Sequence, residues 1–525
     1  MAHSHQTSPP RRAAPSSPPL KAPPPPFEPR PSYVRSAPRS RPASARRIVA
    51  CFDGTGNAFG QNITNIPTLF SLASEDPDKQ LLYYQTGVGT AVSTHESAWA
   101  PGKVWEKIIQ TVDEAVAFSL GKHICDGYRF LMDHWRPGDE IYLFGFSRGA
   151  HTARALAGML QQVGLLPAGN EETIPLAFSI YKRKAETVLV PGVETLAQGF
   201  KRTFSRDVDV HFVGVWDTVA SVGALIPRTL PFASGSSYIN TFRQALALDE
   251  ARARYYPQPW ITEVPCASAP AERAQSDVME VWFSGAHSNV GGGDFPYDGD
   301  RAPNLSHLSL WWMLREAVEA GFELDSARVA TSPLFAPFVD AARTALDARS
   351  DPALSAFLRN AKENNAELNE LIAATVFLAA RPSATATAAA LAPRANHISF
   401  ALAKRPAEER EKRGWKGRLA DWWSRVQSRA MTAFWWFLEL SPGLKVYWDA
   451  EGNTRRWWFG ANRGRGRLLP RAPLFHVSVR ERLAASGAAA FGPGNNESFP
   501  EGEHYHFKAR FPKRSTGMAS VTYVE

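Results

Sequence analysis

The stretch Gly145-Phe146-Ser147-Arg148-Gly149 decides the fold, because it places a serine between a strand and a helix. The apolar run Ile141–Phe144 before it is typical of a short buried strand, and Ala150–Leu160 after it has a helical pattern. A Gly-x-Ser-x-Gly sequence in this context predicts a nucleophile elbow, a tight strained turn that presents the serine hydroxyl at the carboxyl edge of a sheet. Glycines allow the turn to close, and the helix N-terminus favours developing negative charge.

Strand and helix patterns alternate along the chain on both sides of this turn. The apolar runs that predict strands are Arg47–Phe52, Leu81–Gln85, Ile141–Phe144, Val208–Val215 and Val278–Phe283. The helical patterns are Val104–Trp135, Ala150–Val163 and Leu305–Ala320. Such alternation predicts an α/β fold, a mostly parallel sheet with helices on both faces.

The N-terminal segment differs in composition from the rest of the chain. Residues 1–46 hold 13 of the 40 prolines and few aliphatic side chains, so we expect a disordered Pro/Arg-rich tail. Residues 1–47 contain nine Lys/Arg and one acid, Glu28, which accounts for the whole net charge of +8. The remainder has 50 basic and 50 acidic residues, so we expect no nucleic-acid partner.

Several classes of site and location are not expected from the sequence. No apolar stretch is long enough to span a bilayer, and the first residues lack the apolar region of a signal peptide. The cysteines Cys51, Cys125 and Cys266 lie far apart and predict neither a disulfide nor a zinc site. Gly54-Thr55-Gly56 lacks the following Lys-Ser/Thr of a P-loop. We therefore expect a chain made in the cytoplasm, without a metal or a cofactor.

The last part of the chain is basic and rich in tryptophan. Apolar residues spaced three and four apart run along Leu419–Leu438, with arginines such as Arg425 and Arg429 on or beside the other face. This pattern suits an interfacial membrane helix, and it also suits a helix packed on the domain. Short runs at Val446–Trp448, Arg456–Phe459 and His506–Phe511 suggest antiparallel strands in a smaller accessory layer. We expect a catalytic domain over residues 47–400 and an accessory region, membrane-facing or a lid, over 401–525.

A serine nucleophile needs a histidine base and an orienting carboxylate. Asp217 follows the apolar run 208–216, and His287 follows the run 278–283. Both would lie at the carboxyl ends of strands, where open α/β sheets keep their chemistry, and they follow Ser147 in the order Ser, acid, His.

Other residues remain open for these roles. An aspartate after a strand also commonly caps the next helix, which is a second interpretation of Asp217. His151 lies close to Ser147 in sequence, but the helix would point it away, whereas His504 and His506 near the C-terminus are the main rivals for the base. For the oxyanion hole we expect the amide of Arg148 and that of Gly54 or Thr55, which follow the first strand.

Six motifs occur in an order that resembles a known family. They are Phe52–Asn57, Tyr84–Thr90, Gly145–Arg154, Val215–Val219, Ala245–Glu250 and Trp282–Gly293. Together they resemble the phospholipase effectors of bacterial type VI secretion, first lipase-effector family, and their uncharacterised α/β-hydrolase relatives. The resemblance covers roughly residues 48–321, with weaker similarity at Trp435–Glu439 and His476–Arg480.

The resemblance implies an α/β-hydrolase core, a Ser-Asp-His triad and hydrolysis of carboxylic esters, with glycerophospholipids as substrates in the secreted members. It places the nucleophile at Ser147 and the base at His287. Some effectors take the acid from just after the nucleophile helix begins, but residues 155–160 contain no carboxylate, which favours Asp217 with Asp249 in reserve. It further suggests an antibacterial effector with a secretion adaptor or immunity protein as partner. A non-lipid carboxylesterase and a catalytically silent membrane- or partner-binding protein are the alternatives.

Overall fold

A computed structural model describes the part of the chain on which the following account rests. It covers residues 33–34, 45–54, 62–87, 120–183, 195–219, 236, 238–252, 255–260, 276–296, 305–335, 445–448, 454–457, 466–467, 469–470, 473–485, 509 and 521–524. Within these residues no helix is long and apolar enough to cross a membrane.

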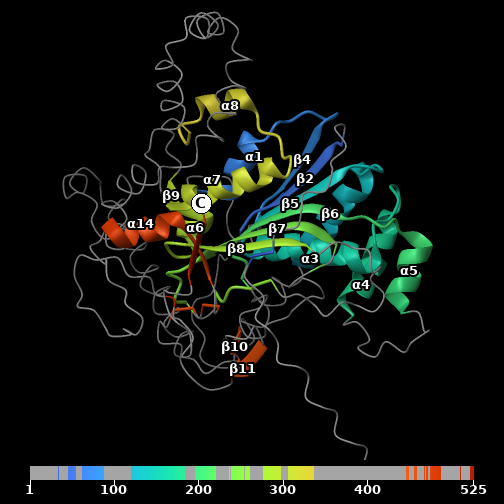
Figure 1. Ribbon diagram of the computed structural model, residues 1–525. Helices are drawn as coiled ribbons and strands as arrows, with labels where there is room; N and C mark the ends of the chain where they lie inside the picture. Colours follow the sequence, from blue (N-terminus) through green and yellow to red (C-terminus); the bar gives the residue numbers. More distant parts are fainter. Residues whose placement is uncertain are drawn as a thin grey trace, which may run out of the picture.

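A twisted, mostly parallel sheet forms the centre of the molecule (Figure 1). Its strands follow the order β13-β12-β8-β7-β6-β5-β2-β4, and neighbours along this path pair in parallel. Their bounds are β2 Arg47–Phe52, β4 Gln80–Gln85, β5 Glu140–Phe146, β6 Val210–Trp216, β7 Ile239–Ala247, β8 Asp277–Phe283, β12 Leu474–His476 and β13 Thr522–Val524. Strand β1, Tyr33–Val34, pairs antiparallel with β8.

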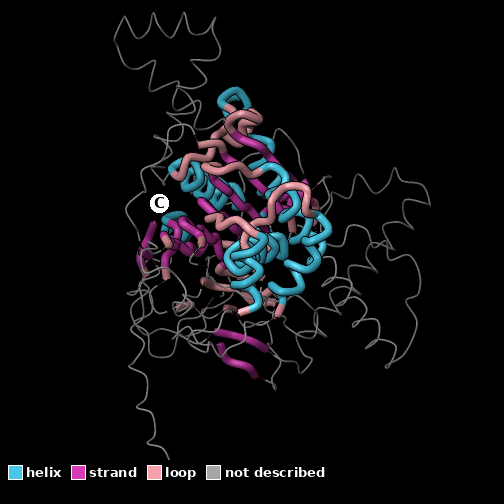
Figure 2. The backbone as a smooth tube through the Cα atoms, turned by 90° about the vertical axis from the view of Figure 1, so that its right-hand side faces the viewer, coloured by secondary structure: helices cyan, strands magenta, loops and turns pink. Residues whose placement is uncertain are grey.

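Helices cover both faces of this sheet (Figures 1 and 2). One face carries the helical residues 120–134 with α3, α4 and α5, and the other carries α1, α7 and α8. The bounds are α1 Asn65–Leu72, α3 Arg148–Val163, η1 Glu171–Thr173, α4 Ile174–Lys182, α5 Leu196–Phe204, α6 His287–Gly291, α7 Leu305–Glu319, α8 Ser326–Thr331 and α14 Val477–Ala485.

The side chains of β2 show how one strand serves two cores. Ile48, Ala50 and Phe52 pack into the cluster under α3, whereas Val49 and Cys51 pack into the cluster under α7. Because successive side chains of a strand point to opposite faces, a continuous apolar run is needed where both faces are buried. This explains why β2 is apolar at every position from Ile48 to Phe52.

The predicted α/β fold is confirmed, and the five predicted strands correspond to β2, β4, β5, β6 and β8. Strand β7 was not predicted, although it lies between β6 and β8. Its sequence Ile239–Ala247 contains Asn, Thr, Arg and Gln, which hides the apolar pattern. Arg243 and Gln244 are buried with partners of their own, Glu316 and Glu280.

The C-terminal part of the chain joins the main sheet instead of forming only a separate layer. Strands β12 and β13 extend the sheet in parallel beyond β8, and a third apolar cluster with Trp282, Leu469 and Phe475 holds them there. Within the described C-terminal residues, the expected antiparallel pairing occurs in the hairpin of β10, Lys445–Trp448, and β11, Thr454–Trp457, which lies apart from the main sheet (Figures 1 and 2). A two-stranded sheet of β3, Asn62–Thr64, and β9, Gly292–Pro296, completes the described strands.

Several predictions concern residues that lie outside the described ranges. The tail over residues 1–46 is described only at 33–34 and 45–46, and Leu419–Leu438 and His506–Phe511 lie outside the described residues apart from Ala509. The predicted boundary between the catalytic domain and the accessory region, at residues 400 and 401, also lies outside the described residues. These remain predictions.

The strand order reverses between β2 and β5. The chain passes from β2 to β4 on one side of β2, and then to β5 on its other side. Open α/β sheets bind ligands at the carboxyl ends of the strands beside such a reversal. The turn after β5 carries Ser147 and lies at this position.

Candidate active site

Ser147 occupies a strained turn between β5 and α3. Its backbone angles are φ 58° and ψ −119°, one of two non-glycine positive φ values among the described residues. A Cβ at Gly145 would lie 2.5 Å from the carbonyl oxygen of Gly149, and one at Gly149 would lie 2.2 Å from that of Phe52. Only glycine fits at either position, which gives the two glycines of the motif a steric reason.

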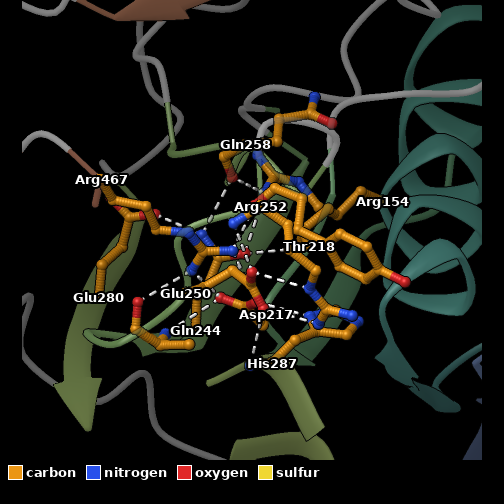
Figure 3. A network of polar contacts seen from close by, with 12 residues as sticks. Arg154, Asp217, Thr218, Gln244, Glu250, Arg252, Gln258, Glu280, His287 and Arg467 are labelled. Carbon is orange, nitrogen blue, oxygen red and sulfur yellow. Dashed lines mark hydrogen bonds and ion pairs between the residues drawn. The ribbon is translucent and has the colours of Figure 1, made fainter. Parts of the chain in front are cut away.

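Asp217 follows β6 and is the other strained residue, with φ 41°. Its carboxylate is fully buried, and Oδ1 accepts a hydrogen bond from the amide of Ala247 at 3.0 Å. The amide of Ser147 donates to the carbonyl of Trp216 at 3.0 Å, so the turns after β5 and β6 are joined directly. Among the described residues its hydrogen bonds go to β7, to a histidine and to an arginine, and none of them caps a helix (Figure 3).

His287 begins the short helix α6 directly after β8. Its Nδ1 lies 2.6 Å from Asp217 Oδ2, and its ring packs on Phe146 at 4.7 Å and against the edge of Tyr255 at 4.8 Å. The side chain is 5% exposed. Two residues 70 positions apart in sequence are thus brought together at the carboxyl edge of the sheet, as predicted (Figure 3).

The glycines after His287 allow this helix to lie close to the elbow. A Cβ at Gly291 would lie 1.9 Å from the ring of Phe146, and one at Gly292 would lie 2.8 Å from the backbone of Thr64. The side-chain amide of Asn65 donates to the carbonyls of Val290 and Ser306, both at 3.0 Å, which fixes α6 to α7. Nothing in the local sequence pattern singled out Asn65.

Arg467 reaches the site from the C-terminal segment, and sequence reasoning did not find it. It is 4% exposed, and its two terminal nitrogens donate to both carboxylate oxygens of Asp217 (Figure 3). Burial by itself raises the pKa of Asp217, but the charge of Arg467 and the hydrogen bonds from His287 and Arg467 hold this pKa well below its usual range. Asp217 is therefore ionised near neutral pH. Arg467 lies in an Arg/Gly-rich stretch 250 residues away, which carried no signal for the pairing.

Glu250 supports the same site from the loop after β7. Its Oε2 accepts from the amide of His287 at 3.3 Å and from Arg252 at 2.7 Å. Burial raises the pKa of Glu250, but Arg252 outweighs this effect and lowers it. The start of α6 is thus held by a second ionised carboxylate.

The expected oxyanion donors are placed differently from one another. The amide of Gly54 already donates to the carboxylate of Asp53 at 2.6 Å, and Thr55 lies outside the described residues. Arg148 is the first residue of α3, where backbone amides have no partner within the helix. Its amide remains the donor we expect for an oxyanion.

The rivals for base and acid have other partners. His151 is fully buried, its Nδ1 lies 3.0 Å from Gln258 Oε1, and burial lowers its pKa to about 4. Asp249 accepts from the amide of Gly285 at 2.7 Å, which ties the end of β7 to that of β8. His504 and His506 lie outside the described residues.

Among the described residues, no hydrogen bond joins Ser147 to His287 in this structure. Among the described contacts, none joins the Ser147 hydroxyl to the imidazole, although the ring of the adjacent Phe146 lies against it. Catalytic hydrogen bonds are often long in the absence of substrate. The described residues contain no group of three or more His, Cys, Asp or Glu side chains that could hold a metal ion.

Comparison with known proteins identifies the family. The sequence model of the T6SS phospholipase effector Tle1-like catalytic domain matches residues 46–316, about half of the chain. The chain belongs to this family of type VI secretion lipolytic effectors and their relatives, and the resemblance inferred from the six motifs is confirmed.

Individual relatives are more distant. The uncharacterized protein YEL023C of Saccharomyces cerevisiae is 31% identical in an alignment of length 399, and the match covers 54% of this chain and 58% of that protein. The chain thus spans less than two thirds of this relative. An uncharacterized protein from Pseudomonas aeruginosa shows 20% identity over 54% of this chain and 46% of that one, with a TM-score of 0.29. The Tle1 effector bound to the VgrG spike shows 19% identity over 50% and 53%, with a TM-score of 0.28.

Proposed function

We propose that this chain is a serine hydrolase of carboxylic esters and acts on phospholipids as a phospholipase of the A type. Ser147 is the nucleophile, His287 the general base and Asp217 the residue that orients it. The observation that carries the proposal is the 2.6 Å contact between Asp217 and His287 at the sheet edge where the strained turn presents Ser147. Family membership supports a lipid ester as substrate.

The reaction would proceed in two acyl-transfer steps. Ser147 Oγ attacks the acyl carbonyl carbon while His287 Nε2 takes its proton, and the carbonyl oxygen becomes an oxyanion facing the Arg148 amide. When the ester bond breaks, His287 returns the proton to the leaving lysolipid oxygen. A water molecule then attacks the acyl-serine in the same way, releasing the fatty acid and restoring Ser147.

The acid is suited to this role because it stays ionised. Asp217 accepts from the His287 Nδ1–H, which fixes the tautomer that leaves Nε2 free to accept the serine proton. Its depressed pKa means that it holds a negative charge throughout the cycle. It therefore stabilises the imidazolium without taking its proton.

Export and membrane contact extend the proposal. Membership in a family of type VI effectors supports delivery of this chain to a target cell, with a secretion adaptor or an immunity protein as its partner. The Trp-rich stretch Leu419–Leu438 would provide peripheral contact with the lipid surface. A secretion assay with and without a functional type VI apparatus tests the first point.

The activity is tested with three reagents on the full chain and on Ser147→Ala. A fluorophosphonate probe should label the wild-type chain only, and the wild-type chain should cleave p-nitrophenyl esters and vesicle phospholipids labelled in one acyl chain. Cleavage of the soluble ester without the lipid would favour a carboxylesterase with another substrate. A folded wild-type chain that reacts with none of the three would exclude the hydrolase and favour a silent binding protein.

A further inference from the structure

Arg467 binds two backbone carbonyls near the site in addition to the Asp217 carboxylate. Besides the two bonds to Asp217, its Nη1 donates to the carbonyl of Ala247 at 3.0 Å and its Nη2 donates to the carbonyl of Tyr255. The fork therefore joins the end of β7, the loop beyond it and the carboxylate after β6 (Figure 3). Such planar, two-pronged binding of a carboxylate needs a guanidinium, and lysine cannot reproduce it.

The segment that carries Arg467 is fixed to the sheet by its own apolar contacts. Leu469, two residues on, is buried with Phe475 and Trp282 in the cluster that docks β12 on β8. Arg467 is thus placed by the packing of the C-terminal segment against β8.

The charged groups that face His287 come from four parts of the chain. Asp217 contacts its Nδ1, Glu250 contacts its amide, and Tyr255 meets its ring edge. Arg467 lies behind Asp217, and Arg252 lies behind Glu250. Each carboxylate near the imidazole therefore has its own guanidinium, and the field at the ring is smaller than two buried carboxylates alone would produce.

We propose that Arg467 is a positioning residue that holds the Asp217 carboxylate in the orientation that meets His287 Nδ1, so that the C-terminal segment completes the proposed catalytic site. The inference rests on the proposed function in that His287 is the base. Without the guanidinium, the buried carboxylate loses two charge-assisted hydrogen bonds and its charge is left unbalanced, so that it can turn away from the imidazole.

The test compares Arg467→Met, Arg467→Lys and a matched control, Arg243→Met, in the full chain. Arg243 is buried to a similar degree, 5% exposed, and pairs with Glu316 and Asp277 farther along β7. The readouts are the NMR signal of the His287 Nδ1 proton, assigned with His287→Ala, and kcat and KM for a soluble ester.

Arg467→Met should move the Nδ1 proton signal or broaden it beyond detection, because the Asp217 carboxylate is no longer held against the ring. It should also lower kcat by about tenfold to a hundredfold with KM little changed, as expected for the loss of hydrogen bonds to a charged group. Arg467→Lys should lower kcat less, since the charge stays and the fork is lost. Arg243→Met should lower stability without changing the Nδ1 signal or kcat.

An unchanged Nδ1 signal and kcat in folded Arg467→Met would overturn the inference, as would equal changes in Arg243→Met. If Arg467→Met does not fold, Arg467→Gln takes its place with the same expected changes. Because the NMR signal needs no turnover, its outcome is separate from that of the proposed function. A changed Nδ1 signal in a chain without esterase activity would refute the hydrolase and retain the role of Arg467 in placing Asp217.

Discussion

Two buried polar networks lie side by side near the ends of β6, β7 and β8, and their histidines have different hydrogen-bond partners. In the first, His287 contacts the carboxylate of Asp217, which is paired with Arg467. In the second, His151 contacts the neutral amide of Gln258, and its pKa falls to about 4 because burial dominates. The first histidine contacts an ionised carboxylate, whereas the described contact of the second is with a neutral amide.

The carboxylates of the two networks also have different partners, and their pKa values shift in opposite directions. Glu280 in the second network is reached by the side chain of Gln244 at 2.6 Å and by the amide of Trp260 at 2.9 Å (Figure 3). Burial raises its pKa, whereas a direct ion pair with Arg467 leaves that of Asp217 depressed. Arg154 binds the backbone carbonyls of Gln258 and Pro259.

The difference separates a framework from the proposed reaction site. Among the described residues the hydrogen bond of the His151 imidazole goes to a side-chain amide, and none goes to a carboxylate. The Asp217–His287 pair has such a carboxylate contact, and it lies beside the strained serine turn. A histidine close to Ser147 in sequence is therefore structural, while one 140 residues away is the proposed base.

The largest expected effect separates the two histidines by rate. Ser147→Ala and His287→Ala should each lower ester hydrolysis by about a thousandfold or more, and the double variant should be little worse, because triad members act as a unit. The control His151→Gln, which keeps a polar group toward Gln258, should leave the rate nearly unchanged. Steady-state kinetics on a soluble ester provides the measurement.

Two outcomes would contradict the assignment of His287 as the base. If His287→Ala keeps most of its activity while His504→Ala or His506→Ala abolishes it, the base lies near the C-terminus. Loss of activity in folded His151→Gln would move the base to α3.

The second prediction concerns the acid. Asp217→Asn should lower kcat by about 10²- to 10⁴-fold, because the amide favours the wrong histidine tautomer and leaves Arg467 unpaired. Asp249→Asn is the matched control, since its side chain keeps an oxygen that accepts from Gly285. Near-normal turnover in Asp217→Asn, with loss in Asp249→Asn, would transfer the role of the acid to Asp249.

The third prediction tests the second network through stability. The pKa of His151 is about 4 in the folded chain, against about 6.5 when unfolded, so the unfolded chain binds the extra proton between these values. The free energy of unfolding should therefore fall as the pH falls from about 6.5 towards 4, by up to about 3 kcal/mol from this group.

His151→Gln removes that contribution. Between pH 7 and pH 5, wild type should lose about 2 kcal/mol more of its free energy of unfolding than the variant does, as measured by urea denaturation. Parallel pH dependences for the two proteins would mean that His151 is not held neutral by burial.

The smallest effect concerns the Trp-rich stretch, which lies outside the described residues. If it is an interfacial helix, replacing Trp422 and Trp423 with alanine should weaken binding to anionic vesicles by roughly tenfold and slow hydrolysis of vesicle lipid. Hydrolysis of a soluble ester should stay nearly unchanged, because the proposed triad is elsewhere. Equal loss on both substrates, or unfolding, would indicate a core helix or a lid.

Local sequence determined the fold class and the position of the three residues of the proposed triad. Apolar runs buried on both faces predicted β2, β5, β6 and β8, and Ser147, Asp217 and His287 each follow such a run. Parallel strands bring their carboxyl ends to one edge, so the order along the chain was enough to predict that Asp217 and His287 would meet. The glycines of the elbow could also be predicted, because their role depends only on the local turn.

Only the tertiary structure decided the rest of the site. Strand β7 was hidden because its polar residues find buried partners on other elements, such as Glu316 for Arg243. Asn65 and Arg467 act through contacts 225 to 250 residues away, and nothing in their own neighbourhoods encodes those partners. The docking of β12 on β8 brings Arg467 to Asp217, so the pairing depends on how distant apolar surfaces pack, which a local pattern does not contain.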